Sequence, residues 1–129
     1  MTSEDLIAVA TVARERAYAP YSGFHVGAAI LCDTGEVFSG ANIENVSFGL
    51  TICAERVALG CAVIAGHTNF SRVAIVAETA EPIVPCGACR QVLAEFNPKL
   101  EINSANLKGR SQLFELGLLL PLSRQGILG

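Results

Sequence analysis

Three cysteines and one glutamate stand at spacings that could build a catalytic metal site. Cys86 and Cys89 are three residues apart, which places two thiolates on one face in the first turn of a helix. A third thiolate from Cys53 would complete three protein ligands to a tetrahedral zinc ion and leave the fourth position for water, as in catalytic zinc sites. Glu55 follows Cys53 by two residues and supplies the acid/base group that such a water needs. The pattern predicts one Zn²⁺ per chain.

Other uses of the cysteines remain as alternatives. A pair of cysteines three apart also occurs in redox sites, but a redox pair would need neither Cys53 nor Glu55. A structural zinc site would need a fourth ligand, and the remaining candidates are Cys32, Cys61, His25 and His67. Cys61 lies two helical turns beyond Cys53, too far to share its metal. We therefore interpret both spare cysteines as core residues and both histidines as non-ligands.

Arg56, next to Glu55, could donate hydrogen bonds to the cysteine sulfurs. Three thiolates and a divalent ion sum to a formal charge of about −1, which weakens the metal as a Lewis acid. A guanidinium beside the sulfurs would offset that charge. The alternative for Arg56 is an ordinary surface arginine.

Hydrophobic periodicity and turn residues predict seven elements that must position these side chains. We expect helices over residues 3–18, 51–65 and 86–96, and strands over 26–32, 36–41, 73–77 and 100–103. The residues after Gly109 give no clear pattern. This order suggests a mixed sheet with helices on both faces. Both cysteine motifs fall at helix N-termini, where the helix dipole favours thiolates.

The spacing of Glu55 from Cys53 raises a geometric question. Residues two apart on a regular helix point to nearly opposite sides. A carboxylate at this position would reach a water on the Cys53 metal only through a distorted first turn or a curled side chain.

Composition restricts the function classes. A chain of 129 residues is the size of one domain, and 51% hydrophobic residues with only 16% charged ones suggest that a subunit interface buries part of the excess. The net charge of −3 and the lack of any Lys/Arg run argue against a nucleic-acid partner. No signal peptide or transmembrane run is apparent, so no membrane association is expected. Five cysteines without an export signal favour a cytoplasmic protein.

Four motifs in sequence order extend the pattern beyond the metal site. They are residues 19–29 (APYSGFHVGAA), 40–45 (GANIEN), 49–56 (GLTICAER) and 85–92 (PCGACRQV). Together they resemble the small cytidine deaminases, and the metal residues match the zinc-deaminase signature in its three-cysteine form. The resemblance covers residues 16–93 without a gap and extends weakly to 106–109.

The resemblance implies a fold and an activity. The fold is α/β, a three-layer α/β/α sandwich with a five-stranded mixed sheet, here as a single domain over residues 1–129. The activity is zinc-dependent hydrolytic deamination of cytidine and deoxycytidine to uridine and deoxyuridine, a step of pyrimidine salvage. The family usually forms homotetramers with active sites at the subunit interfaces.

The resemblance also assigns roles to residues near the metal. Asn42 and Glu44 correspond to the family's ribose-binding pair, and Phe24 to the aromatic side chain that contacts the base. Backbone groups around Ala54 are expected to hold the polar edge of the ring. Glu55 is expected to carry protons from water to the ring nitrogen N3 and to the departing amine. The plain alternative for residues 42–45 is a polar turn after a strand.

Two departures from the family pattern concern the substrate range. Phe48 stands where many members have tyrosine, and Arg124 stands where the pattern Leu-Leu-Pro-x-x-Phe places a phenylalanine that closes a neighbouring subunit's pocket. A deaminase of a modified cytidine or related aminopyrimidine nucleoside is therefore the alternative enzyme, although Asn42 and Glu44 favour a ribose. A zinc module without catalysis is the non-enzyme alternative, against which Glu55 argues.

Overall fold

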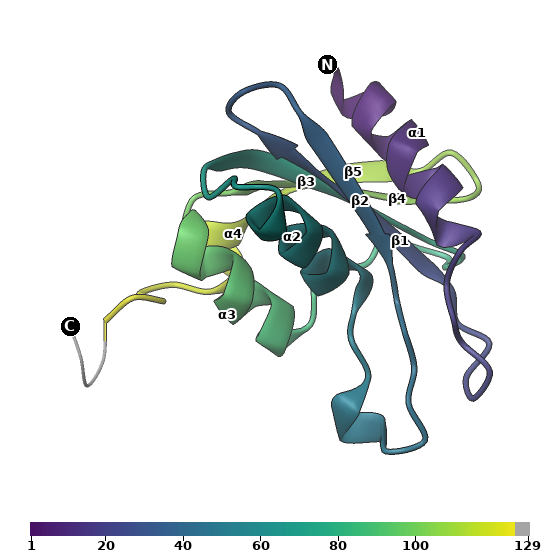
Figure 1. Cartoon of the computed structure of the whole chain (residues 1–129). Coiled ribbons are helices and arrows are strands. Elements are labelled where there is room, and N and C mark those ends of the chain that lie inside the picture. The colour runs from purple at the N-terminus through teal and green to yellow at the C-terminus, as the bar shows by residue number, and fades with distance from the viewer. Residues whose placement is uncertain (126–129) are drawn as a thin grey trace.

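The computed structural model describes residues 1–125, and their fold is built around one five-stranded sheet (Figure 1). Its elements are, in chain order, α1 (Ser3–Arg14), β1 (Val26–Cys32), β2 (Val37–Ala41), the 3-10 helix η1 (Phe48–Leu50), α2 (Ala54–Ile64), β3 (Phe70–Ala77), α3 (Gly87–Phe96), β4 (Glu101–Asn106), β5 (Ser111–Glu115) and α4 (Leu116–Leu119). The strand order is β2-β1-β3-β4-β5; β3 and β4 are parallel and all other neighbours antiparallel. The predicted mixed sheet is confirmed.

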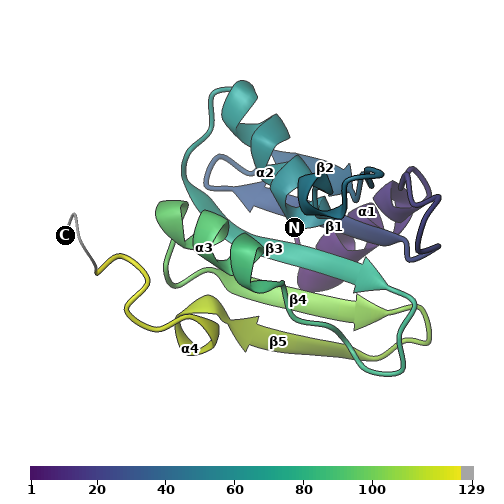
Figure 2. The same ribbon diagram turned by 90° about the horizontal axis from the view of Figure 1, so that it is seen from below.

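The central strands are covered by helices on both faces, which gives three layers (Figure 2). Val73 and Ile75 of β3 point into the core beneath α2 and α3, whereas Ala74 and Val76 point toward α1. Successive residues of a strand alternate between faces, so a strand buried on both faces becomes a continuous apolar run. This explains the unbroken Val-Ala-Ile-Val-Ala segment. None of the helices in residues 1–125 has the length and apolar character needed to span a bilayer.

Most predicted elements exist with shifted ends. The first helix ends at Arg14 rather than near residue 18, and Thr2 is its N-cap. Thr2 and Asp5 form a reciprocal capping box, with hydrogen bonds of 2.9 and 3.1 Å. β3 starts three residues earlier than expected, at Phe70, and β4 continues to Asn106.

Apart from the single 3-10 turn η1, the elements that sequence patterns missed lie after Gly109. β5 is an edge strand whose residues are mostly exposed, including Leu113. Its pairing with β4, rather than any hydrophobic alternation of its own, makes it a strand. The one-turn helix α4 follows it directly.

The prediction that both spare cysteines are core residues is half wrong. Cys32 is buried, but Cys61 is exposed on α2. The buried face of α2 is carried by Ala54, Ala58 and Ala62, and Cys61 lies outside that stripe. Apolar character alone could not show which side of the helix meets the sheet.

Strand β2 approaches the first turns of α2 very closely at Gly40. A Cβ atom on Gly40 would lie 2.5 Å from the backbone nitrogen of Ala58 and 2.8 Å from the carbonyl oxygen of Ala54. Both atoms belong to backbone and cannot move aside without moving the helix. The absence of a side chain at Gly40 therefore sets the distance between the sheet and the helix that begins at Cys53.

We expect Gly40→Ala to lower the free energy of unfolding by about 1–3 kcal/mol, because overpacking displaces α2. Gly117→Ala is the matched control, since a Cβ there meets its nearest neighbour, the oxygen of Pro98, at an ordinary 3.5 Å. Urea unfolding of both variants measures the difference. Equal stability of the two variants would contradict the close-contact argument.

Candidate active site

Two helix N-termini meet at the predicted metal site. Cys53 is the N-cap of α2 and Cys86 the N-cap of α3, and their sulfur atoms are 3.7 Å apart. Cys89 lies in the first turn of α3, where its backbone N–H donates to the Cys86 sulfur at 3.5 Å. The predicted placement of both cysteine motifs at helix N-termini is confirmed.

The three sulfurs fit a tetrahedral zinc ion. They lie within 4.8 Å of one another, and two sulfurs each 2.3 Å from a tetrahedral ion would be about 3.8 Å apart. Cys32, Cys61 and both histidines are not members of this group. Three thiolate ligands on adjoining helix ends leave the fourth position free for water, and the cluster accommodates one Zn²⁺ per chain.

The backbone conformation of Cys53 explains how Glu55 can lie near the metal site. As an N-cap, Cys53 has extended backbone angles, φ −71° and ψ 155°, so the helical rule for residues two apart does not apply to this pair. Glu55 is 4% exposed and lines the same cavity as Cys53. Burial disfavours the charged carboxylate and raises the pKa of Glu55 to about 7. A buried carboxyl group thus lies beside the thiolate cluster.

Arg56 contacts the cluster through its guanidinium group. Its Nη2 lies 3.5 Å from the Cys53 sulfur, and its Nε is buried without a partner among the described residues. The pKa of the Cys53 thiol is lowered, first by a hydrogen bond from the Cys89 thiol and then by Arg56. Arg56 is therefore placed against the cluster, and the alternative of an unattached surface arginine does not describe its position.

The cluster forms one end of a cleft of about 390 Å³. The cleft brings together every predicted substrate-site residue, namely Phe24, Asn42, Glu44, Ala54 and Glu55. Sequence reasoning missed four other residues of its wall, Val26, Thr51, Ile83 and Val84. Ile83 and Val84 are partly buried, and Ile83 packs against the main core, so no local pattern marked them as part of the cleft.

The polar side chains of Asn42 and Glu44 already have protein partners. The Asn42 oxygen accepts from the Val26 N–H at 2.9 Å, and its Nδ2 donates to the Phe24 carbonyl at 2.8 Å. Glu44 Oε1 accepts from the backbone N–H groups of Tyr21 (2.9 Å) and Ser22 (3.1 Å). The side chains are thus held in place, with one Asn42 N–H still free.

The altered C-terminal residue lies away from this cleft. Arg124 is exposed in the segment after α4, which runs beside α3 and away from the projecting loop that contains η1 (Figure 1). Phe114 packs against the core and so does not cover the cleft of its own chain. Ile127 lies outside the described residues.

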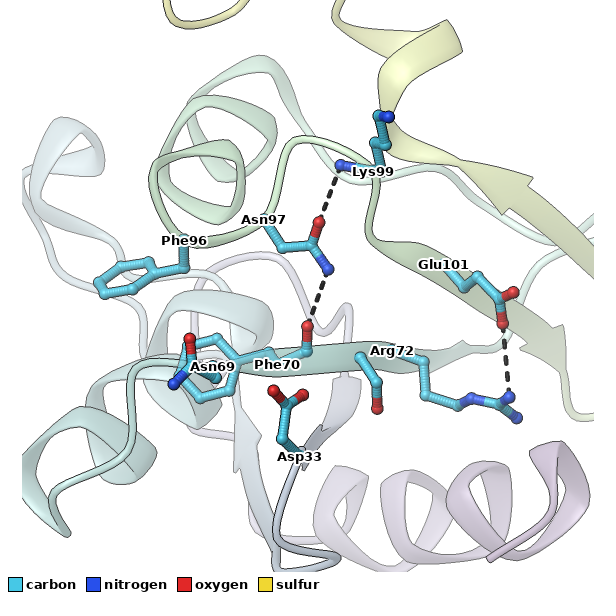
Figure 3. A pocket seen from close by; sticks show the side chains of 9 residues that line it. Asp33, Asn69, Phe70, Arg72, Phe96, Asn97, Lys99 and Glu101 are labelled. Atoms are coloured by element: carbon cyan, nitrogen blue, oxygen red, sulfur yellow. Dashed lines mark hydrogen bonds and ion pairs between the residues drawn. The ribbon is translucent and has the colours of Figure 1, made fainter.

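A larger hollow of about 440 Å³ lies at the opposite end of β3 (Figure 3). Some of its polar groups pair with one another: Asn97 Nδ2 donates to the Phe70 carbonyl at 2.8 Å, and Arg72 Nη2 lies 3.4 Å from Glu101 Oε2. The residues that line this hollow include none of the three clustered cysteines and none of the predicted substrate-site residues. Size alone does not identify the reactive site in this protein.

Sequence and structure comparisons agree with the geometry. Residues 1–102 match the family described as "Cytidine and deoxycytidylate deaminase zinc-binding region". A cytidine deaminase from Halalkalibacterium halodurans is 50% identical over 122 residues, which cover 94% of this chain and 92% of that protein. A cytidine deaminase from Sporosarcina psychrophila is 48% identical over 122 residues, covering 94% and 90%.

The fold is likewise shared with a solved structure. A cytidine deaminase from Burkholderia pseudomallei superposes with a TM-score of 0.92 at 50% identity, covering 95% of this chain and 98% of that one. The expected α/β/α fold is confirmed. The family profile matches most of the chain, the relatives match nearly all of it, and the three cysteines form one cluster. This chain therefore belongs to the zinc-dependent cytidine deaminase family.

Proposed function

We propose that this cleft binds cytidine or deoxycytidine and hydrolyses the exocyclic amine, giving uridine or deoxyuridine and ammonia. The observation that carries the proposal is the position of Glu55: a buried carboxyl group stands beside a three-thiolate cluster in a cleft that also contains Asn42 and Glu44. A site that only stabilised the fold would have no use for a buried acid next to its metal.

Glu55 is proposed to carry the protons of the reaction. Zinc, when bound, supplies a water of lowered pKa at this end of the cleft. Glu55 would take a proton from that water and return protons to the ring nitrogen N3 and to the leaving amine. The surrounding apolar groups, Ala54 at 0% exposure among them, keep the carboxyl group away from bulk water. Arg56 is proposed to offset the negative charge of the sulfurs.

The proposed sugar site follows from the free hydrogen-bonding positions. A carboxylate accepts about four hydrogen bonds, and Glu44 already takes three, two from backbone and one from the Ser22 hydroxyl. One acceptor on Glu44 and one donor on Asn42 suffice for a single sugar hydroxyl. We therefore expect both ribose and deoxyribose nucleosides to be used, with Phe24, Ile83 and Val84 forming apolar walls for the base.

We further propose a homotetramer whose subunit interfaces adjoin the cleft. Large apolar side chains are exposed along the segment that projects from the sheet before α2 (Figure 1): Ile43, Val46, Phe48, Leu50 and Ile52. A second exposed apolar site is Ile64 on α2, at 91% exposure. Apolar surface of this extent favours association. Because Glu44 and Thr51 of the same segment line the cleft, a neighbouring subunit would lie next to the substrate.

The cellular setting is part of the same proposal. None of the five cysteines forms a disulfide, which supports a reducing compartment, the cytoplasm, and a role in pyrimidine salvage. Because one sheet contains every strand of residues 1–125, we also propose that residues 1–129 act as a single domain.

Cys86→Ala should abolish zinc binding, because two thiolates cannot complete the tetrahedral site. Cys61→Ala removes an exposed cysteine outside the cluster and serves as the control. Metal analysis of the purified proteins should give about one zinc per chain for the control and near zero for Cys86→Ala. Full zinc retention in Cys86→Ala would refute the ligand assignment.

Glu55→Gln should keep zinc and fold while turnover of cytidine falls at least ~10²-fold, the low end for general acid/base groups. The amide preserves size and hydrogen-bonding reach but cannot carry the proton. Loss of cytidine absorbance measures activity, and Glu95→Gln, an exposed glutamate on α3, is the control. Near-parent turnover in Glu55→Gln would assign proton transfer to another group; no turnover by the parent protein would reject the proposed function itself.

Ile64→Glu should shift the protein toward smaller assemblies, because a charge replaces an apolar side chain at the proposed interface. Val12→Glu changes a valine that is 67% exposed on α1, on the other face of the sheet, and should leave the assembly unchanged. Sedimentation velocity measures the assembly size of both variants and of the parent protein. A monomeric parent would overturn the tetramer.

A further inference from the structure

The hydroxyl of Ser22 lies between two residues of the proposed nucleoside site. Ser22 Oγ donates to Oε2 of Glu44 and accepts from the backbone N–H of Phe24 at 3.0 Å. A serine hydroxyl has a single proton to donate, and that proton is committed to the carboxylate. One side chain therefore connects the carboxylate that would meet the sugar with the aromatic residue that would meet the base.

The backbone around Ser22 brings the hydroxyl to this position. Gly23 has a positive φ of 69° and donates its N–H to the Ala19 carbonyl at 3.0 Å, which closes a tight turn. The turn directs the backbone N–H groups of Tyr21 and Ser22 at Glu44 Oε1. Glu44 is thus held by backbone at one oxygen and by the serine at the other.

The hydrogen bonds continue from Phe24 to the second sugar residue. The Phe24 carbonyl accepts from Asn42 Nδ2 at 2.8 Å, while the Phe24 N–H is held by Ser22. Glu44, Ser22, Phe24 and Asn42 therefore form one connected chain of hydrogen bonds along the cleft. The only member of this chain without a proposed substrate contact is Ser22.

We propose that Ser22 is a positioning residue for nucleoside binding, aligning the carboxylate of Glu44 and the backbone of Phe24 through its single hydroxyl. The proposal rests on the proposed function, namely that Glu44 and Phe24 contact the nucleoside. Without the hydroxyl, Oε2 loses the only donor it has within residues 1–125, and the Phe24 N–H loses its acceptor. The carboxylate would be free to rotate about the oxygen that the backbone still holds.

The ionisation of Glu44 supports this role. Its pKa lies below the ordinary glutamate value, chiefly because the Ser22 hydroxyl donates to it, with further contributions from the Tyr21 and Ser22 N–H groups. The carboxylate is therefore charged at neutral pH and only accepts hydrogen bonds. Ser22 itself is exposed and outside the hydrophobic core, so its hydroxyl can be removed without leaving a cavity.

The test compares Ser22→Ala with Ser22→Thr in steady-state deamination of cytidine. We expect KM to rise about tenfold in Ser22→Ala with kcat within about twofold, because the loss falls on substrate binding rather than on proton transfer. Ser22→Thr keeps a hydroxyl on the same carbon and should restore the parent KM. Ser39→Ala, an exposed serine on β2 outside the cleft, should leave both constants unchanged. Unfolding temperature and zinc content are measured for every variant.

A second comparison separates Ser22 from the proposed sugar site. Glu44→Ala is measured alone and combined with Ser22→Ala; if Ser22 acts through Glu44, its KM effect should shrink to about threefold or less in that background. The role of Ser22 would be overturned if the increases in KM from Glu44→Ala and Ser22→Ala simply multiply in the double variant. It would also be overturned by an unchanged KM in Ser22→Ala, or by a lowered unfolding temperature with unchanged kinetics. If Glu44→Ala alone uses cytidine normally, the proposed sugar contact fails and the Ser22 proposal fails with it.

Discussion

The site depends on two helix N-termini held against each other. Cys53 caps α2 and Cys86 caps α3, and their sulfurs are 3.7 Å apart although 33 residues separate them in the chain. The N-terminus of a helix carries unpaired N–H groups and a partial positive charge, so it stabilises thiolates. Any displacement of one helix along the other would separate the ligands, and the packing of both helices on the sheet therefore determines whether a metal can bind.

Small residues make this packing possible. α2 meets the sheet through Ala54, Ala58 and Ala62, and Gly40 of β2 allows its backbone to contact the helix directly. Because these small residues bring the backbones close together, the start of α2 has little freedom to shift. The same start carries Glu55 and Arg56, so the acid, the guanidinium and one metal ligand move as a unit. Rigidity of this kind suits a reaction in which protons pass between fixed groups.

The nucleoside end of the cleft is organised by hydrogen bonds rather than by helix packing. Asn42 and Glu44 follow an edge strand, and their side chains are held by the turn that contains Ser22 and by the start of β1. Some of the hydrogen-bonding groups of each side chain are used by protein partners, and these bonds fix the orientation of the groups that remain free. The two ends of the cleft thus differ: buried apolar contacts place the acid, and a polar network places the groups proposed to recognise the sugar.

The type of chemistry could be predicted from the amino-acid sequence, because ligand types and spacing, the nearby acid and the four ordered motifs are local properties of the chain. The buried strands were equally predictable, since their apolar runs require cover on both faces. The way in which Glu55 shares a cleft with Cys53 depends instead on the folded structure, where Cys53 has the extended conformation of an N-cap and α2 begins after it. Tertiary structure likewise decided that Cys61 faces outward, that β5 pairs at the sheet edge, and that Ile83, Val84 and Ser22 adjoin the site. These depend on contacts between distant segments, which local patterns do not encode.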